Sequence, residues 1–138
     1  MNPILLDTHT LIWLIEGNPR LSQTARREIQ AAANQNNLLI SAITPWEIGL
    51  LVSKKRIDLH TDALSWTNRV LGYPGVHLVP LFPAIAIASS NLPFEMHADP
   101  ADRILVATAR HLGATLITAD ELLLRHGAEG RFRCLSAI

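Results

Sequence analysis

Several features that would place a protein in other classes are scarce or absent in this 138-residue sequence. The single cysteine, Cys134, excludes an intrachain disulfide and a thiolate metal site, and we expect a buried, unreactive thiol in a reducing compartment. No apolar run approaches the roughly 18 residues that span a bilayer, so we expect no membrane helix. The first residues lack the basic segment of a signal peptide, which favours a cytoplasmic protein.

Charge is also scarce, because charged residues make up 17% of the chain and cancel to a formal net charge of zero. The overall balance therefore gives no sign of a nucleic-acid partner, and the local basic clusters at 54–56 and at Arg131 and Arg133 are more typical of a solvated surface. Hydrophobic residues make up 49%, which is more than a soluble monomer usually carries and indicates a partner surface. The length predicts one domain, residues 1–138.

Short apolar runs alternate with longer helical patterns, which predicts an α/β fold with a parallel sheet covered on both faces. The expected strands are Ile4–Leu6, Leu38–Ser41, His77–Pro80, Thr115–Thr118 and Phe132–Leu135. The expected helices are Thr8–Ile15, Leu21–Ala33, which Ser22 would cap, Pro45–Lys55, Asp62–Leu71, Pro83–Ser90, Pro100–Leu112 and Asp120–His126, which would close at Gly127.

Acidic residues follow the ends of several expected strands. Asp7 ends the first strand, Glu47 comes shortly after the second, Asp102 opens the helix before the fourth, and Asp120 follows the fourth within two residues. Parallel sheets bind ligands at the carboxyl ends of their strands, so these acids could share one rim. Gathered there, the carboxylates would repel one another unless a divalent cation lay among them, and Mg²⁺ or Mn²⁺ prefers such oxygen ligands.

Each acid also has a structural explanation. Thr44 to Glu47 forms a capping box with proline at the first helical position, and Asp99 with Asp102 offers an acidic helix start. Thr118 to Glu121 forms a third such start, and Asp7 could cap the first helix. Taken singly, most of these acids favour capping, and only their coincidence favours a metal site.

Four blocks of sequence together resemble the PIN-domain nucleases, specifically the VapC-type toxins of bacterial toxin–antitoxin pairs. The blocks are residues 5–13, which contain Leu-Asp-Thr-His, residues 40–48, which contain Thr-Pro-Trp-Glu, residues 99–109, which begin Asp-Pro-Ala-Asp-Arg, and residues 116–120, which read Leu-Ile-Thr-Ala-Asp. They run in the family's order through nearly the whole chain. Any one block is weakly specific, but the four together are highly specific.

The resemblance implies a three-layer α/β/α sandwich whose central parallel sheet of four to five strands has the order 3-2-1-4-5. It implies RNA cleavage by a water that Mg²⁺ or Mn²⁺ activates, with Asp7, Glu47, Asp102 and Asp120 as the catalytic and metal-binding acids. Asp120 is the least certain of these, since an apolar run follows it. Further implied residues orient the acids or lie next to them: Thr8, Thr118, Asp99 and Arg103, the last of which would neutralise Asp102 or contact phosphate.

The same resemblance implies an RNA substrate, a VapB-like antitoxin that covers the acidic rim and a homodimer. It requires no histidine, so we expect His9 and His97 to lie at the surface or beside the acids, and the three tryptophans to pack in the core or an interface.

Other readings of the residues stay open. A haloacid-dehalogenase-like phosphatase would need a second aspartate where His9 stands, and a response-regulator receiver would need one at the end of the third strand, where Pro80 and Leu81 stand. A catalytically silent α/β interaction domain predicts no cleavage with any metal.

Overall fold

The computed structural model describes residues 2–138 and contains five strands and seven helices in that range. The strands are β1 (Ile4–Leu6), β2 (Leu38–Ser41), β3 (Val76–Val79), β4 (Thr115–Thr118) and β5 (Cys134–Ser136). The helices are α1 (Thr8–Glu16), α2 (Gln23–Asn34), α3 (Ile43–Ser53), α4 (Ala63–Leu71), α5 (Pro83–Ser89), α6 (Pro100–Leu112) and α7 (Glu121–Ala128). The described helices include none with the length and apolar character needed to cross a membrane.

The five strands form one sheet in the order β3-β2-β1-β4-β5, and each neighbouring pair is parallel. This confirms the predicted fold class and strand order. The central strand β1 pairs on one side with β2, where Ile4 lies opposite Leu38, and on the other with β4, where Ile4 lies opposite Thr115. The strand order therefore reverses between β1 and β4, and ligands of open parallel sheets bind beyond the strand ends at such a point.

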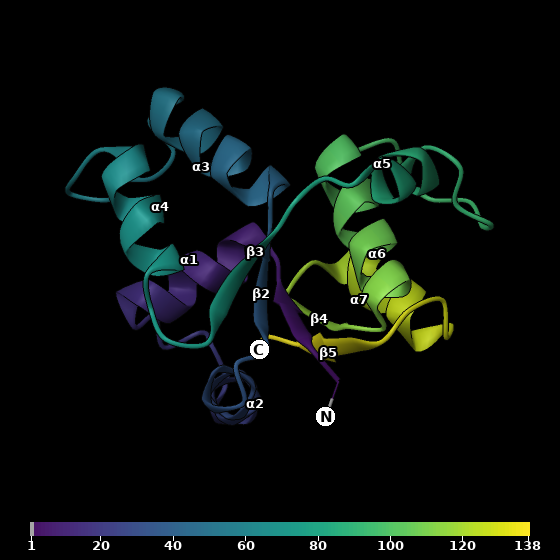
Figure 1. Ribbon diagram of the computed structural model, residues 1–138, viewed down its shortest axis with the longest axis horizontal. Coiled ribbons are helices and arrows are strands. Elements are labelled where there is room, and N and C mark those ends of the chain that lie inside the picture. Colours follow the sequence, from purple (N-terminus) through teal and green to yellow (C-terminus); the bar gives the residue numbers. More distant parts are fainter. Residues whose placement is uncertain (1) are drawn as a thin grey trace.

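Helices cover both faces of the sheet, because successive side chains of a strand point to opposite faces. Ile4 and Leu6 of β1 pack in a cluster with apolar residues of α1 to α4, whereas Leu5 packs in a second cluster with residues of α6 and α7. In Figure 1, α5, α6 and α7 accordingly lie on one side of the sheet and α1, α3 and α4 on the other. The result is the expected three-layer α/β/α sandwich.

Two strands lie away from their predicted positions. Strand β3 begins at Val76, one residue early, because Val76 pairs with Leu38 and the paired stretch ends at Val79, just before a proline that has no N–H to donate. Strand β5 begins at Cys134, two residues late, because Phe132 is buried in the core cluster beside α7 instead of extending the sheet.

Several helix ends also differ from prediction by one or two residues, and those of α3 and α7 have clear structural reasons. Helix α3 begins at Ile43, two residues before the predicted Pro45, and the N–H of Ile43 donates a hydrogen bond to the Ser41 hydroxyl at 3.1 Å. Helix α7 continues through Gly127, which was expected to end it. Gly127 instead allows close approach of β5, since a Cβ atom there would lie 2.4 Å from the Cβ of Cys134.

The turn before β3 requires the glycine that the sequence places there. Gly75 has a φ of +84°, which L side chains rarely adopt, and an added Cβ would lie 2.0 Å from the carbonyl oxygen of Ala33. The carbonyl of Gly75 accepts a hydrogen bond from the N–H of Leu38 at 3.0 Å. This close approach docks the end of α2 against the start of β3.

Candidate active site

The predicted acids meet in one pocket at the carboxyl ends of β1 and β4. The pocket has a volume of about 420 Å³. Its lining residues come from four segments and are Asp7, Thr8, His9, Trp13, Glu47, Asp99, Asp102, Leu105, Ala119 and Asp120. The folded chain thus brings together five carboxylates that lie up to 113 positions apart in the sequence (Asp7 to Asp120).

Asp7 is held from two directions at the base of this site. It is the N-cap of α1, and its Oδ1 accepts the N–H of Thr10 at 2.8 Å. Its Oδ2 accepts a hydrogen bond from the hydroxyl of Thr118, the last residue of β4. The Asp7 residue is only 9% exposed and the Thr118 residue is fully buried. Thr118 was expected beside an acid, and it fixes the orientation of Asp7 across the strand switch.

Glu47 reaches the same pocket from α3 and is bound by Thr8. The Thr8 hydroxyl lies 2.5 Å from Glu47 Oε1 and 3.3 Å from the hydroxyl of Thr44, which is fully buried. The predicted capping box at Thr44 is therefore wrong: the N-cap of α3 is Ala42, which makes no side-chain capping bond. Glu47 therefore has no role in capping the helix.

The surroundings of Glu47 disfavour its charged form. Burial raises the pKa of Glu47 above its ordinary value, and the hydrogen bond from Thr8 partly opposes this. Repulsion from the other pocket carboxylates raises the pKa further, and these are Asp102, Asp99 and Asp7. Negative charge is thus concentrated where it is poorly solvated.

The start of α6 contributes two more acids, of which one caps the helix and the other binds a histidine. Asp99 is the N-cap, and its Oδ1 accepts the N–H of Asp102 at 3.1 Å, as the capping prediction required. Asp102 lies in the first turn, and its Oδ2 is 2.7 Å from Nε2 of His97. Burial raises the pKa of Asp102, the His97 hydrogen bond opposes that shift, and the negative charges of Asp99 and Asp120 add to it.

Asp120 stands at the exposed edge of the pocket. It is the N-cap of α7, where its Oδ1 accepts the N–H of Leu123 at 3.0 Å, and its own N–H donates to the Thr118 hydroxyl at 3.0 Å. The Thr118 hydroxyl therefore connects Asp120 to Asp7. Capping uses one oxygen of Asp120 and leaves its other oxygen to the pocket.

Arg103 is a predicted site residue that does not line the pocket. Its Nε donates to the carbonyl of Ser89 at 2.8 Å and its Nη1 to the carbonyl of Met96 at 3.1 Å. The guanidinium therefore binds backbone carbonyls and, among the described residues, forms no ion pair with Asp102.

Sequence reasoning left three pocket neighbours outside the site. His9 and Trp13 line the pocket, and His97 binds Asp102. The signal for His9 and Trp13 was their spacing within the helix that Asp7 caps, and the signal for His97 was its place just before the acidic block that begins at Asp99. Of the other tryptophans, Trp66 is buried in the core, whereas Trp46 is 58% exposed, which leaves only the interface alternative of the prediction for Trp46.

The donor set fits a hard divalent cation. Among residues 2–138, no three His, Cys, Asp or Glu side chains already stand together as a finished metal-ligand group. Mg²⁺, however, keeps several waters and needs only one or two direct carboxylates. A pocket of about 420 Å³ lined by carboxylates, in which burial and then like charges raise the pKa of Glu47 and Asp102, suits such a hydrated ion.

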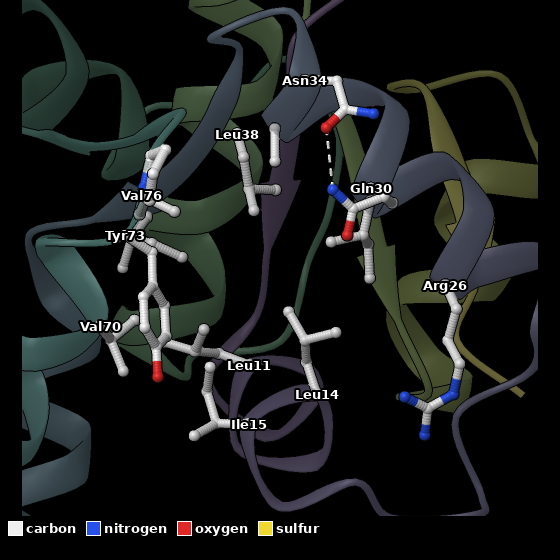
Figure 2. A pocket seen from close by; sticks show the side chains of 14 residues that line it. Leu11, Leu14, Ile15, Arg26, Gln30, Asn34, Leu38, Val70, Tyr73 and Val76 are labelled. Carbon is white, nitrogen blue, oxygen red and sulfur yellow. Dashed lines mark hydrogen bonds between the residues drawn. The ribbon is translucent and has the colours of Figure 1, made fainter.

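A second hollow lies on the other side of α1 and has a different chemistry. It has a volume of about 660 Å³ and is lined by residues of α1, α2, α4, β2 and β3. Figure 2 shows Leu11, Leu14 and Ile15 of α1 on one wall, with Leu38 and Val76 from the strands on the other. Most of the residues that line it are apolar and none is an acid, so this hollow does not offer the carboxylate ligands of the first pocket.

Comparison with known proteins agrees with this geometry. The family model described as the PIN domain matches residues 4–129. The chain is 34% identical over 126 residues to "Ribonuclease VapC22" of Mycobacterium tuberculosis, covering 91% of this chain and 93% of that protein.

Solved structures support the same fold. One is the crystal structure of VapBC2 from Rickettsia felis bound to a DNA fragment from their promoter, with a TM-score of 0.71, 17% identity and coverage of 96% of this chain and 97% of that chain. Another is a toxin–antitoxin complex from Klebsiella pneumoniae, with a TM-score of 0.59, 25% identity and coverage of 85% of this chain and 86% of that chain.

Proposed function

The chain belongs to the PIN-domain family, and on that premise we propose that it is a ribonuclease toxin that hydrolyses RNA phosphodiester bonds with the help of Mg²⁺ or Mn²⁺. The observation that carries the proposal is the single pocket in which Asp7, Glu47, Asp102 and Asp120 converge from four segments. A chain that places mutually repelling carboxylates in one half-buried pocket needs a reason other than stability, and cation binding supplies it.

In this proposal Asp7, Glu47 and Asp102 hold the cation, and Asp120 binds it directly or through a water. A divalent cation bound there would offset negative charge on the phosphate and acidify the attacking water. Thr118 and Thr8 orient Asp7 and Glu47 through the hydrogen bonds described above. The reaction forms a bond from the water oxygen to phosphorus as the bond to the leaving sugar oxygen breaks, so no side chain needs to act as nucleophile.

The partner in this proposal is a VapB-like antitoxin, since the R. felis relative was solved as a VapBC assembly and the K. pneumoniae relative as a toxin–antitoxin complex. The apolar hollow of Figure 2 would bind apolar side chains of that partner. A basic side chain of the antitoxin placed among the pocket carboxylates would inhibit cleavage by bidentate pairing. We also propose a homodimer, in keeping with the high apolar content of the chain.

The decisive experiment is cleavage of cellular RNA by the purified chain with EDTA, Mg²⁺ or Mn²⁺. We expect activity only with metal, and we expect Asp7→Asn and Asp102→Asn each to lower kcat/KM by roughly 100-fold or more, about 2.7 kcal/mol of transition-state stabilisation. Glu28→Gln is the matched control, because Glu28 is an exposed acid of α2 outside the pocket. It should retain full activity.

Two results would reject the proposal. A folded chain that cleaves no RNA with either metal would favour the silent interaction domain. Turnover of a small phosphomonoester that exceeds RNA cleavage would favour the phosphatase reading, although His9 stands where that chemistry needs a second aspartate.

A further inference from the structure

The segment between α5 and α6 carries a side chain that the proposed reaction has not used. His97 lies on this segment, and its Nε2 is 2.7 Å from Oδ2 of Asp102. The two side chains are 26% and 21% exposed, so the contact is shielded from water on most sides. A carboxylate can only accept a hydrogen bond, which means that Nε2 carries the proton and donates.

We propose that His97 is a positioning residue that holds one oxygen of Asp102 so that the other, Oδ1, is left for the cation. The inference rests on the nuclease function proposed above and deepens it. A carboxylate without such a partner rotates between several orientations and must lose that freedom each time it binds a metal. Hydrogen bonds from neighbouring groups remove this cost and are known to strengthen metal sites on the order of 10-fold to 100-fold.

The other nitrogen of His97 argues that the ring is not there for stability. Nδ1 is buried and makes no hydrogen bond with any residue of the range 2–138. A buried polar atom without a partner destabilises a fold, and an apolar side chain of similar size would avoid that cost. The ring is therefore better explained by its contact with Asp102 than by packing.

Arg103 holds the segment on which His97 stands. Its guanidinium donates to the carbonyls of Met96 at 3.1 Å and of His97 itself at 3.5 Å, while its Nε reaches Ser89 at the end of α5. The residue next to Asp102 thus ties α6 to the backbone that carries the His97 ring. This explains why Arg103 follows Asp102 without reaching the acidic pocket.

His97 acts through Asp102 and not on the RNA. Its side chain lines a separate hollow of about 480 Å³, together with Phe94, Met96, Leu122 and others, and does not line the acidic pocket. A general acid or base would have to reach the phosphate from inside the acidic pocket. The geometry therefore assigns positioning rather than proton transfer.

The test compares three variants of the full chain. His97→Leu removes the donor, His97→Gln restores an amide N–H at similar reach, and His126→Ala is the matched control, because His126 lines the same hollow and contacts the Phe94 ring instead of a carboxylate. Mn²⁺ affinity is measured by titration calorimetry without RNA, and kcat and KM are measured on RNA. Circular dichroism checks that each variant folds.

We expect His97→Leu to weaken Mn²⁺ binding on the order of 10-fold and to lower kcat by a similar factor, with the KM for RNA nearly unchanged. His97→Gln should recover most of both, and His126→Ala should match the parent. Parental Mn²⁺ affinity in folded His97→Leu would overturn the inference, and so would a loss of kcat alone, since that would place His97 on the substrate. A parent chain that neither binds Mn²⁺ nor cleaves RNA would instead reject the nuclease function itself.

Discussion

The hydroxyl of Thr118 gives the sharpest test of how this site is built. It donates to Oδ2 of Asp7 at the end of β1 and accepts the N–H of Asp120 at the start of α7. Thr118→Val keeps the shape of the side chain and removes only these two bonds. The change therefore isolates the connection across the strand switch from the packing of the core.

The expected loss follows from the two bonds. A hydrogen bond to a charged group contributes about 1.5–3 kcal/mol, and an unpaired N–H costs about 1–3 kcal/mol when buried. Asp120 is exposed, so water can hydrogen-bond to its N–H and most of that cost disappears. Asp7 is only 9% exposed, so water replaces little of the hydrogen bond that it loses. We therefore expect the free energy of unfolding to fall by about 3 kcal/mol, which corresponds to a lower Tm by roughly 10 °C.

The assay is urea unfolding followed by circular dichroism, combined with RNA cleavage at a temperature where each variant is folded. Thr108→Val is the matched control, because Thr108 is equally buried but its hydroxyl donates only to the Ile104 carbonyl of its own helix. It should cost less than about 1 kcal/mol and leave cleavage unchanged. Thr118→Ser keeps the donor and should retain cleavage. If Thr118→Val costs no more than Thr108→Val, the reasoning about this hydroxyl is wrong.

Three further predictions concern other parts of the chain. Burial and neighbouring charges raise the pKa of Glu47 in the folded state, so the metal-free protein should lose stability as the pH rises from the unfolded value of 4.5 through the raised folded pKa. Glu47→Gln should therefore be more stable than the parent at pH 7, and this difference should vanish below pH 4.5 when unfolding is measured at each pH. Gly75→Ala should lower the free energy of unfolding by about 4 kcal/mol or more, because its Cβ would overlap the Ala33 carbonyl, and a change under 1 kcal/mol in urea unfolding would contradict this. Burial raises the pKa of Cys134 to about 11, so at pH 8 iodoacetamide should modify it roughly 100-fold more slowly than a free thiol, and equal rates by mass spectrometry would refute the assignment.

Much of the fold was predictable because local patterns and tertiary structure agree. Strands β1, β2 and β4 lie at the predicted residues, as does α6. These segments are short apolar runs or a periodic helix with clear ends, and burial of the strands on both faces leaves them little alternative. The bounds of β3, β5, α3 and α7 differ from prediction because they depend on strand pairing, packing or hydrogen bonds with a neighbouring segment.

The site was predicted less completely, for a related reason. The acids could be found because each stands at a strand end or helix start, and these positions share one rim in a parallel sheet. Of the partners that orient the acids, Thr8 and Thr118 were implied by the family resemblance, but which acid each one binds was not. His97, five residues from Asp102 on an irregular segment, has no periodicity to mark it, and Arg103 looks like a site residue until its carbonyl partners are seen.

The order of apolar and polar residues by itself determined the α/β class, most of the elements and the four acidic blocks, because these depend on interactions between residues close along the chain. Only the tertiary structure decided that Glu47 binds Thr8 instead of completing a capping box with Thr44, that Thr118 pairs with Asp7, and that Arg103 binds backbone carbonyls outside the pocket. Those choices depend on groups up to 111 positions apart competing for the same donors and acceptors, and that competition is settled only when the sheet brings them together.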